Sequence, residues 1–424
     1  MCIHCHLWVA SFSFLEKLKS MVQLSFSATE LRRRINSFDR FKYNELKQRN
    51  DELLLEIERA ADELFIDGLG VRARKLDDKY IFSSIDIALD LVLRQCVVNI
   101  SSSTPLSFKS RSTICDEIKM FLMDDTPYRV YRLDIKRFFE SITPELVIKT
   151  LNDIAGLSEH TIEIIERIIT DEYITSRTNG LPRGLSISPV ISDLVLSNFD
   201  RVIKRNDNVF YYSRFVDDII IITSGLEDKY DFIGELKNEL PDGLCFNFKK
   251  EKVIDSPEII KKSAGYHKVS INYLGYKYIT TSLTEDGVRK VEIDIADDKV
   301  KKIETRIALS INRFLRSGDF VSLLDRIRFL TTNHKIVQKN NARVINYGIY
   351  YNYARISKES IALDMLDKFL LSSLIYARHA NGTFKLTRVQ EKTILRQSFK
   401  QGHERKIKMS FSPPTILELT SIWK

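Results

Sequence analysis

The stretch VFYYSRFVDDIIIIT at residues 209–223 decides how this chain is interpreted. Its β-branched and aromatic residues favour strands over a helix, and the acids in its middle predict a hairpin with Asp217 and Asp218 at the turn. Two adjacent carboxylates between apolar strands are costly to bury unless a cation or hydrogen bonds compensate. We therefore expect both acids to face a cation, whereas a solvated turn is the competing interpretation of the pair alone.

A second predicted strand ends in the same manner. YRVYRLDI at residues 128–135 alternates in polarity and then reaches Asp134. Oxygen ligands from two strand ends, with no set of His or Cys nearby, suit Mg²⁺ or Mn²⁺ rather than Zn²⁺. Two such ions about 4 Å apart can activate a hydroxyl nucleophile and stabilise a leaving oxygen at phosphorus. The pattern predicts that Asp134 converges with Asp217 and Asp218.

Composition limits the class of protein. The 424 residues carry a formal net charge of +8 and are 44% hydrophobic, which suits a folded protein that meets polyanions and excludes disorder as its main character. Glycine (15) and proline (9) are scarce, which favours many helices. Five scattered cysteines suit a reducing compartment, and no apolar run is long enough to cross a bilayer. We expect a cytoplasmic protein with no membrane partner.

The order of elements is mixed α and β, followed by an almost entirely helical tail, with a boundary near 290–296. A helix is expected to begin at Thr143, with Thr as the N-cap and Pro144 at the first helical position. Apolar periodicity predicts further helices over 28–65, 85–98, 114–121, 188–205 and 228–240, a strand-rich region over 244–291, and long helices over 296–401.

Five motifs occur in an order and spacing that resemble the palm of reverse transcriptases. They are DIKRFFESI (134–142), GLPRGLSISP (180–189), FVDD (215–218), NFKKEKV (247–253) and YLGY (273–276). The resemblance covers roughly residues 70–290. It implies an α+β right-hand polymerase, with fingers, a palm built on an antiparallel sheet, a thumb, and an α-helical C-terminal extension. The implied domains are an N-terminal extension over 1–27, fingers and N-terminal helices over 28–127, a palm over 128–290, and a helical thumb and C-terminal domain over 291–424.

The resemblance also implies roles for the acids. Asp134 and Asp217 would bridge both metal ions, and Asp218 would be the second acid of the pair. The backbone carbonyl of Ile135 would be a further metal ligand. The implied cofactor is Mg²⁺, with Mn²⁺ as the alternative.

Phe139 matches the position of the family's steric gate, a ring that leaves no room for a ribose 2′-hydroxyl. Deoxynucleoside triphosphates are therefore the implied substrates. The competing interpretation places both Phe138 and Phe139 in the hydrophobic core.

The loop GLPRGLSISP is rich in small residues, which allow its backbone to approach a nucleotide closely. It resembles the family's template- and nucleotide-positioning motif, in which Gly184 takes part. The chain departs from the family pattern by carrying Arg183 where Gln is common. Because Arg adds a charge to a planar donor, we expect unusual template handling or nucleotide preference.

Basic residues of the predicted fingers are candidates for contacts with the triphosphate. They are Arg72 in the run VRARK, and Lys109 and Arg111 in SFKSRS, although a charge cluster is more often a solvated face. The lysine that would protonate the departing pyrophosphate is either Lys250 or Lys252, and spacing does not decide between them. We name Lys252 as the substrate-binding candidate. The pair at 274–275 resembles the primer-grip turn.

Two other features have ordinary explanations. Cys2, His4, Cys5 and His6 lack a second half with zinc spacing, so no metal is assigned to them. The run INYGIYYNYARI at 345–356 offers tyrosine hydroxyls, and some relatives attach DNA to a protein hydroxyl, but helical core packing explains most of these aromatic residues.

The tail contains no second set of four acids for a ribonuclease H and no Cys/His nuclease module, which argues against retroviral and group II intron enzymes. The chain resembles the standalone prokaryotic reverse transcriptases of the abortive-infection and antiviral-defence groups, with the type 3 defence branch as the finer assignment. That implies a non-coding RNA as template, dNTPs as substrates and a DNA product. It also implies a second reverse transcriptase or a homo-oligomer as partner. A retron-type enzyme and an inactive RNA-binding scaffold are the alternatives.

Overall fold

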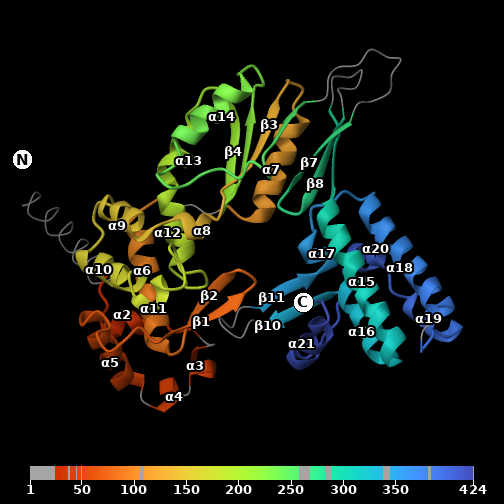
Figure 1. Cartoon of the computed structure of the whole chain (residues 1–424), viewed down its shortest axis with the longest axis horizontal. Helices are drawn as coiled ribbons and strands as arrows, with labels where there is room; N and C mark the ends of the chain where they lie inside the picture. Colours follow the sequence, from red (N-terminus) through yellow and green to blue (C-terminus); the bar gives the residue numbers. More distant parts are fainter. Residues whose placement is uncertain are drawn as a thin grey trace, which may run out of the picture.

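The structure is a computed structural model that describes residues 24–36, 39–43, 45–48, 50–105, 109–256, 268–281, 289–337, 344–380 and 383–423. The residues of the N-terminal Cys/His cluster lie outside this described part. In Figure 1 the N-terminal helices and the helices that follow α15 lie at opposite ends of the view, with the central sheet between and above them. No helix of the described part is long and apolar enough to span a membrane.

The first elements are short helices, a hairpin and two longer helices. In order they are α2 (Ala28–Arg33), α3 (Asp39–Lys42), α4 (Glu45–Gln48), α5 (Asn50–Asp62), β1 (Val71–Leu76), β2 (Lys79–Ser84), α6 (Ile87–Ser103) and α7 (Arg111–Met123). The prediction of one helix over 28–65 is wrong. Asn36 and Asp39 bond each other's backbone N–H groups through their side chains, and the buried Asp39 carboxylate also accepts two hydrogen bonds from Arg94. This side-chain turn competes with the helical backbone bonds and ends α2.

The central sheet has the strand order β4-β5-β3-β6, and every neighbouring pair is antiparallel. Its strands are β3 (Arg129–Asp134), β4 (Val209–Phe215), β5 (Asp218–Thr223) and β6 (Lys252–Asp255). The predicted hairpin over 209–223 is confirmed, with the acids at its turn. Ile219 and Ile221 pack into one hydrophobic core and Ile220 and Ile222 into another, because alternate side chains of a strand point to opposite faces. Both faces of the sheet are therefore covered.

Helices between the strands contribute to the hydrophobic core on one face of this sheet. They are α8 (Phe138–Ser141), α9 (Pro144–Asn152), α10 (Glu159–Ile169), α11 (Glu172–Thr175), α12 (Ser188–Val195), α13 (Ser197–Lys204) and α14 (Lys229–Asn238). The predicted cap of α9 is confirmed, since the Thr143 side chain accepts a hydrogen bond from the N–H of Leu146. The helix predicted over 188–205 is two helices that meet at Leu196.

A three-stranded antiparallel sheet, in the order β7-β8-β9, follows the central sheet. It comprises β7 (Lys268–Tyr273), β8 (Tyr276–Thr281) and β9 (Val291–Ile295). Leu274 and Gly275 form the turn between β7 and β8, and both have a positive φ, of 48° and 78°. The sheet packs with α7 and one face of the central sheet around a shared core.

The C-terminal part has its own hydrophobic core. Its elements are α15 (Asp297–Ser317), α16 (Phe320–Thr331), β10 (Asn333–Val337), β11 (Val344–Gly348), α17 (Ile349–Asn352), α18 (Ile361–His379), α19 (Arg388–Ile394), α20 (Phe399–Glu404) and α21 (Pro413–Ser421). The antiparallel hairpin of β10 and β11 interrupts the run of helices expected over 296–401. Asn333 begins this hairpin and exchanges backbone hydrogen bonds with Ile407 and Met409, so a distant segment stabilises it.

Candidate active site

The register of the central sheet brings the three predicted acids together. Asp134, the last residue of β3, lies opposite Asp218, the first residue of β5. The N–H of Ile135 donates to the carbonyl of Asp217 at 3.1 Å, and the hydroxyl of Tyr273 donates to the carbonyl of Asp218 at 2.8 Å. Val216 adopts a positive φ of 62°, which makes the tight turn between β4 and β5. Acids that are distant in sequence thus lie at one edge of the sheet.

The surroundings of Asp217 and Asp218 disfavour the ionised form of both carboxyl groups. Burial raises the pKa of Asp217, and the charge of Asp134 raises it further, against a smaller lowering by Lys250 and Arg183. Burial likewise raises the pKa of Asp218 despite its ion pair with Arg132, in which Nη2 lies 3.3 Å from Oδ1. A bound cation would relieve this repulsion.

Two residues of the motif NFKKEKV contact Asp134. The carboxylate of Asp134 is largely buried, and it accepts hydrogen bonds from Lys250 Nζ at 2.7 Å and from Asn247 Nδ2 at 3.1 Å. The backbone N–H of Asn247 also donates to the carbonyl of Asp134. Lys252 instead begins β6, is exposed, and lies opposite Arg132 in the sheet. Of the two lysines that the sequence leaves open, the structure brings Lys250 to the acids, and not Lys252, which the sequence analysis favours as the substrate-binding residue.

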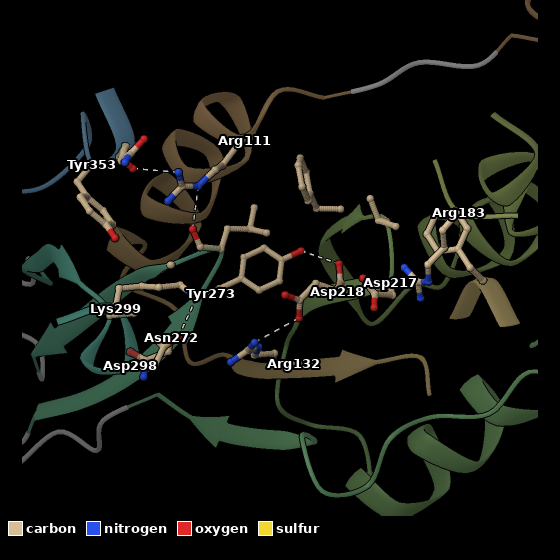
Figure 2. Close-up of a pocket in the computed structure, with 17 residues that line it drawn as sticks. Arg111, Arg132, Arg183, Asp217, Asp218, Asn272, Tyr273, Asp298, Lys299 and Tyr353 are labelled. Carbon is tan, nitrogen blue, oxygen red and sulfur yellow. Dashed lines mark hydrogen bonds and ion pairs between the residues drawn. The ribbon is translucent and has the colours of Figure 1, made fainter. Parts of the chain in front are cut away.

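A cavity of about 680 Å³ opens beside the acids (Figure 2). Asp217 and Asp218 line it, whereas Asp134 is not among its lining residues. The other lining residues come from α7, β3, α8, the loop at 180–189, the β4–β5 hairpin, β7 with the turn that follows it, and the C-terminal part: Arg111, Arg132, Phe139, Arg183, Phe215, Val216, Asn272, Tyr273, Leu274, Gly275, Ala296, Asp298, Lys299, Asn352 and Tyr353. The cavity is therefore walled by the central sheet, the three-stranded sheet and the C-terminal part.

The two phenylalanines after Asp134 have different surroundings. Phe138 is buried in the core, whereas Phe139 is only partly buried and lines the cavity. The location of Phe139 is the one expected of a gate beside the acids. The prediction that both rings belong to the core holds only for Phe138.

The loop over 180–189 lies against this ring. The guanidinium of Arg183 is stacked over the ring of Phe139, 4.5 Å from its centre. Gly184 has a φ of 101°, and a Cβ at this residue would lie 2.4 Å from the carbonyl oxygen of Phe82. The small residue expected at this position is thus required because the loop approaches the backbone of β2 closely, and not because it approaches a nucleotide.

The basic residues expected to contact triphosphate separate into two groups. Arg111 lines the cavity, but its guanidinium donates to the carbonyls of Leu274 at 2.8 Å and Asn352 at 2.9 Å, as Figure 2 shows. Lys109 pairs with Glu117, and Arg72 donates to Ser83. Neither Lys109 nor Arg72 lines the cavity, so the structure does not bring them to the site.

Sequence reasoning missed three groups that contact the acids. Arg132 stands two residues before Asp134 on the same strand, so the period of two places both side chains on one face, and this signal was present in the sequence. Asn247 opens a quoted motif but was not singled out. Tyr273 reaches the turn of the acids from another sheet, and no local pattern indicates that contact.

The donor set suits a divalent cation, because it offers carboxylate oxygens whose burial, and to a smaller extent whose mutual repulsion, raises the pKa of Asp217 and Asp218. Among the residues that the structure describes, however, no three His, Cys, Asp or Glu side chains form a preassembled metal-binding group. Lys250 and Arg132 instead neutralise Asp134 and Asp218. The metal ligands therefore stay a prediction.

Comparison with known proteins identifies the region that carries these motifs. Residues 79–278 match the family model described as reverse transcriptase (RNA-dependent DNA polymerase). The match covers just under half of the chain and includes all three acids, Phe139 and the loop over 180–189. The chain is 29% identical over 143 residues to the retron Ec83 reverse transcriptase of Escherichia coli, which is 32% of this chain and 44% of the relative. The chain thus spans less than half the length of that relative.

Among solved structures, the chain is similar to apo telomerase from Candida tropicalis, with 14% identity, 90% of this chain and 60% of that chain covered, and a TM-score of 0.35. Telomerase from Candida albicans, in complex with a fragment of telomeric RNA, gives 14% identity, coverage of 89% and 57%, and a TM-score of 0.33. Similarities at this level carry no argument of their own. Residues 79–278 carry a reverse transcriptase domain, and the chain has the α+β right-hand polymerase fold with antiparallel sheets that its motifs imply.

Proposed function

We propose that this protein is an RNA-directed DNA polymerase that adds deoxynucleotides to a primer by phosphoryl transfer. The observation that carries the proposal is the register pair of Asp134 and Asp218, which joins two distant motifs beside a cavity that Asp217 also lines. The match of residues 79–278 to the reverse transcriptase family supports the same reaction.

Different residues of the site have different roles in the proposed reaction. Asp134, Asp217, Asp218 and the carbonyl of Ile135 would hold Mg²⁺ or Mn²⁺, which supplies Lewis-acid stabilisation of charge at phosphorus when bound. Phe139, in the cavity wall, would lie against the sugar and exclude a 2′-hydroxyl. Lys250 carries a proton next to Asp134 and is the better-placed donor to the leaving pyrophosphate.

The triphosphate and the primer require cationic and backbone groups on the same cavity. Arg183 and Lys299 line it, as do Leu274 and Gly275 of the β7–β8 turn. We assign the turn to the primer strand, because its positive φ values expose backbone that a strand can approach. Arg111 supports this turn through the carbonyl of Leu274 and does not itself need to bind phosphate.

The biological setting belongs to the proposal as well. We place the enzyme in the cytoplasm, in antiphage defence of the abortive-infection type, with a non-coding RNA as template and a second reverse transcriptase or a second copy as partner. The proposed domains remain an N-terminal extension (1–27), fingers (28–127), palm (128–290) and helical thumb with C-terminal domain (291–424). A retron-type enzyme is the second candidate, favoured by the similarity to the retron Ec83 reverse transcriptase.

Incorporation of labelled deoxynucleotides tests the reaction. The purified protein is given an RNA template, a DNA primer, and Mg²⁺ or Mn²⁺, alongside Asp217→Asn and the control Asp207→Asn, whose acid lies exposed before β4. We expect incorporation by the wild type and the control, and a loss of about 100-fold or more in Asp217→Asn. Binding of RNA without incorporation on any template would instead identify an inactive scaffold and contradict the proposal.

The setting is tested separately in cells. Sequencing the RNA and DNA recovered with the protein identifies the template and decides between a retron-type and another product. Plating of phage on cells that carry wild type or Asp217→Asn measures protection. Loss of protection in the variant is the expected result, and full protection by the variant would contradict a defence role that depends on synthesis.

A further inference from the structure

Arg183 is held by two interactions at once. Its Nε and Nη2 donate to the two carboxylate oxygens of Glu140, at 2.7 Å and 3.0 Å, so the ion pair is bidentate. The same guanidinium lies 4.5 Å from the centre of the Phe139 ring. Both charged side chains are partly buried, with 27% of each exposed, which limits screening by solvent.

The backbone around this pair is fixed on both sides. The N–H of Leu181 donates to the carbonyl of Phe139 at 2.8 Å, and the N–H of Phe82 on β2 donates to the carbonyl of Arg183 at 2.7 Å. A Cβ at Gly180 would lie 2.3 Å from the carbonyl oxygen of Phe139. The loop therefore packs directly on the backbone of the short helix α8, which carries Phe139 and Glu140.

The charges of the pair are maintained in this position. Burial would raise the pKa of Glu140, but the hydrogen bond from Arg183, a backbone hydrogen bond and the charges of Arg183 and Lys79 together outweigh it and leave the pKa below its usual value. Glu140 is therefore ionised at neutral pH and stays paired with Arg183.

We propose that Arg183 and Glu140 are positioning residues that fix the Phe139 ring and thereby set discrimination between deoxyribonucleotides and ribonucleotides. The proposal rests on the proposed polymerase function. A planar guanidinium can stack on a ring and form a bidentate ion pair at the same time. Gln, which is common at this position in the family, carries no charge for either interaction. The positive charge that Arg183 adds is thus paired with the negative charge of Glu140. We call Arg183 and Glu140 together the clamp on the Phe139 ring.

Paired variants separate this role from a direct contact with nucleotide or template. Glu140→Gln and Arg183→Gln each break the ion pair, the double variant removes both partners, and Arg183→Lys keeps the charge without the planar fork. Arg167→Gln is the control, because Arg167 forms a similar ion pair with Asp171 at 2.7 Å and does not line the cavity. Thermal unfolding of each variant verifies that it folds.

Two readouts are taken for dATP and ATP opposite the same template base. One is kcat/KM for addition, and the other is equilibrium binding by calorimetry to the protein with template and primer. We expect the preference for dATP to fall about fivefold to tenfold in Glu140→Gln and in Arg183→Gln. The double variant should match the single variants, since the two residues act as a unit, and the control should keep the wild-type preference.

The outcomes are distinguishable. An unchanged preference, with addition or binding of both nucleotides weakened equally, would overturn the clamp and identify Arg183 as a uniform contact with nucleotide or template. A wild type that adds neither nucleotide would contradict the polymerase function alone. In that case the binding ratio still decides the clamp: a wild-type preference for dATP that Glu140→Gln erases supports it, and equal ratios in both proteins overturn it.

Discussion

At the scale of single residues, the acids of the candidate site carry a cost in stability. Asp217 and Asp218 are partly buried, and burial is the largest cause of the raised pKa of each. A group whose pKa is raised by folding stabilises the fold while it is protonated, below its unfolded pKa. That stability is lost as pH rises through the folded pKa. At neutral pH, ionised Asp217 therefore destabilises the metal-free protein.

Asp217→Asn should for this reason raise the melting temperature while it abolishes activity. At pH 7.5 with a chelator present, we expect an increase of roughly 1–3 °C. The gain should shrink as pH falls through the folded pKa and vanish below the ordinary aspartate value of 3.8, where the wild-type residue is protonated in both states. Differential scanning fluorimetry across pH measures this. A lower melting temperature for the variant at pH 7.5 would contradict the electrostatic account.

The two lysines of NFKKEKV differ in what they contact, and their variants should differ accordingly. Lys250→Gln removes the ammonium at 2.7 Å from Asp134 and should lower kcat about 100-fold. Lys252→Gln is the matched control on exposed β6 and should stay within about threefold of wild type. Single-turnover kinetics measure both. The reverse order of effects would restore Lys252 as the functional lysine.

At the scale of elements, the loop over 180–189 packs against β2 at Arg183 and Gly184. Gly184→Ala combines a φ of 101° with a Cβ 2.4 Å from a backbone oxygen, and we expect a loss of roughly 2–4 kcal/mol. Gly234 lies within α14 with nothing within 4 Å of a Cβ, so Gly234→Ala should stabilise by about 0.5–1 kcal/mol. Urea denaturation compares the two. Equal effects would mean that the loop moves freely away from β2.

Arg111 joins three elements, because it lies on α7 and bonds the β7–β8 turn and the last residue of α17. Its guanidinium also lies 4.6 Å from the centre of the Tyr276 ring. Arg111→Gln should cost about 1–3 kcal/mol, since two partly buried carbonyls lose a charged donor. Lys109→Gln breaks the exposed pair with Glu117 and a cation–π contact with the ring of Tyr211, and it should cost no more than about 1 kcal/mol. A cost for Arg111→Gln no larger than that of Lys109→Gln would show that the three elements hold together without it.

What the sequence predicts well at this scale is local. The β4–β5 hairpin and the Thr143 cap follow from residues that are adjacent in the chain. The break after α2 and the β10–β11 hairpin depend on Arg94 and on residues 407–409, which are distant in sequence. In the site, the motifs located the acids and Phe139, whereas the choice of Lys250 depends on where β6 begins.

At the scale of the whole molecule, the cavity is assembled from all three hydrophobic cores. Asp217 and Phe139 come from the central sheet and its loops, Leu274 from the three-stranded sheet, and Lys299 and Tyr353 from the C-terminal part. Burial raises the pKa of Tyr353 to about 12, so its hydroxyl stays protonated at neutral pH. Residues of the C-terminal part complete the wall of a cavity that Asp217 and Asp218 also line.

The net charge of +8 predicts binding of nucleic acid that depends strongly on salt. We expect the logarithm of the association constant for an RNA–DNA duplex to fall linearly with the logarithm of salt concentration. Asp217→Asn removes a negative charge from the cleft and should bind the duplex as tightly as wild type or more tightly. Fluorescence anisotropy measures both quantities. Binding insensitive to salt would mean that phosphate contacts do not dominate.

The central claim is that Asp134, Asp217 and Asp218 form the site of templated DNA synthesis. Its most direct test is extension of a primer by one nucleotide, with each of the four dNTPs offered separately opposite each of the four RNA template bases. Wild-type protein should add only the complementary deoxynucleotide, and Asp217→Asn should add none. Addition that ignores the template base, or that persists in Asp217→Asn, would contradict the claim.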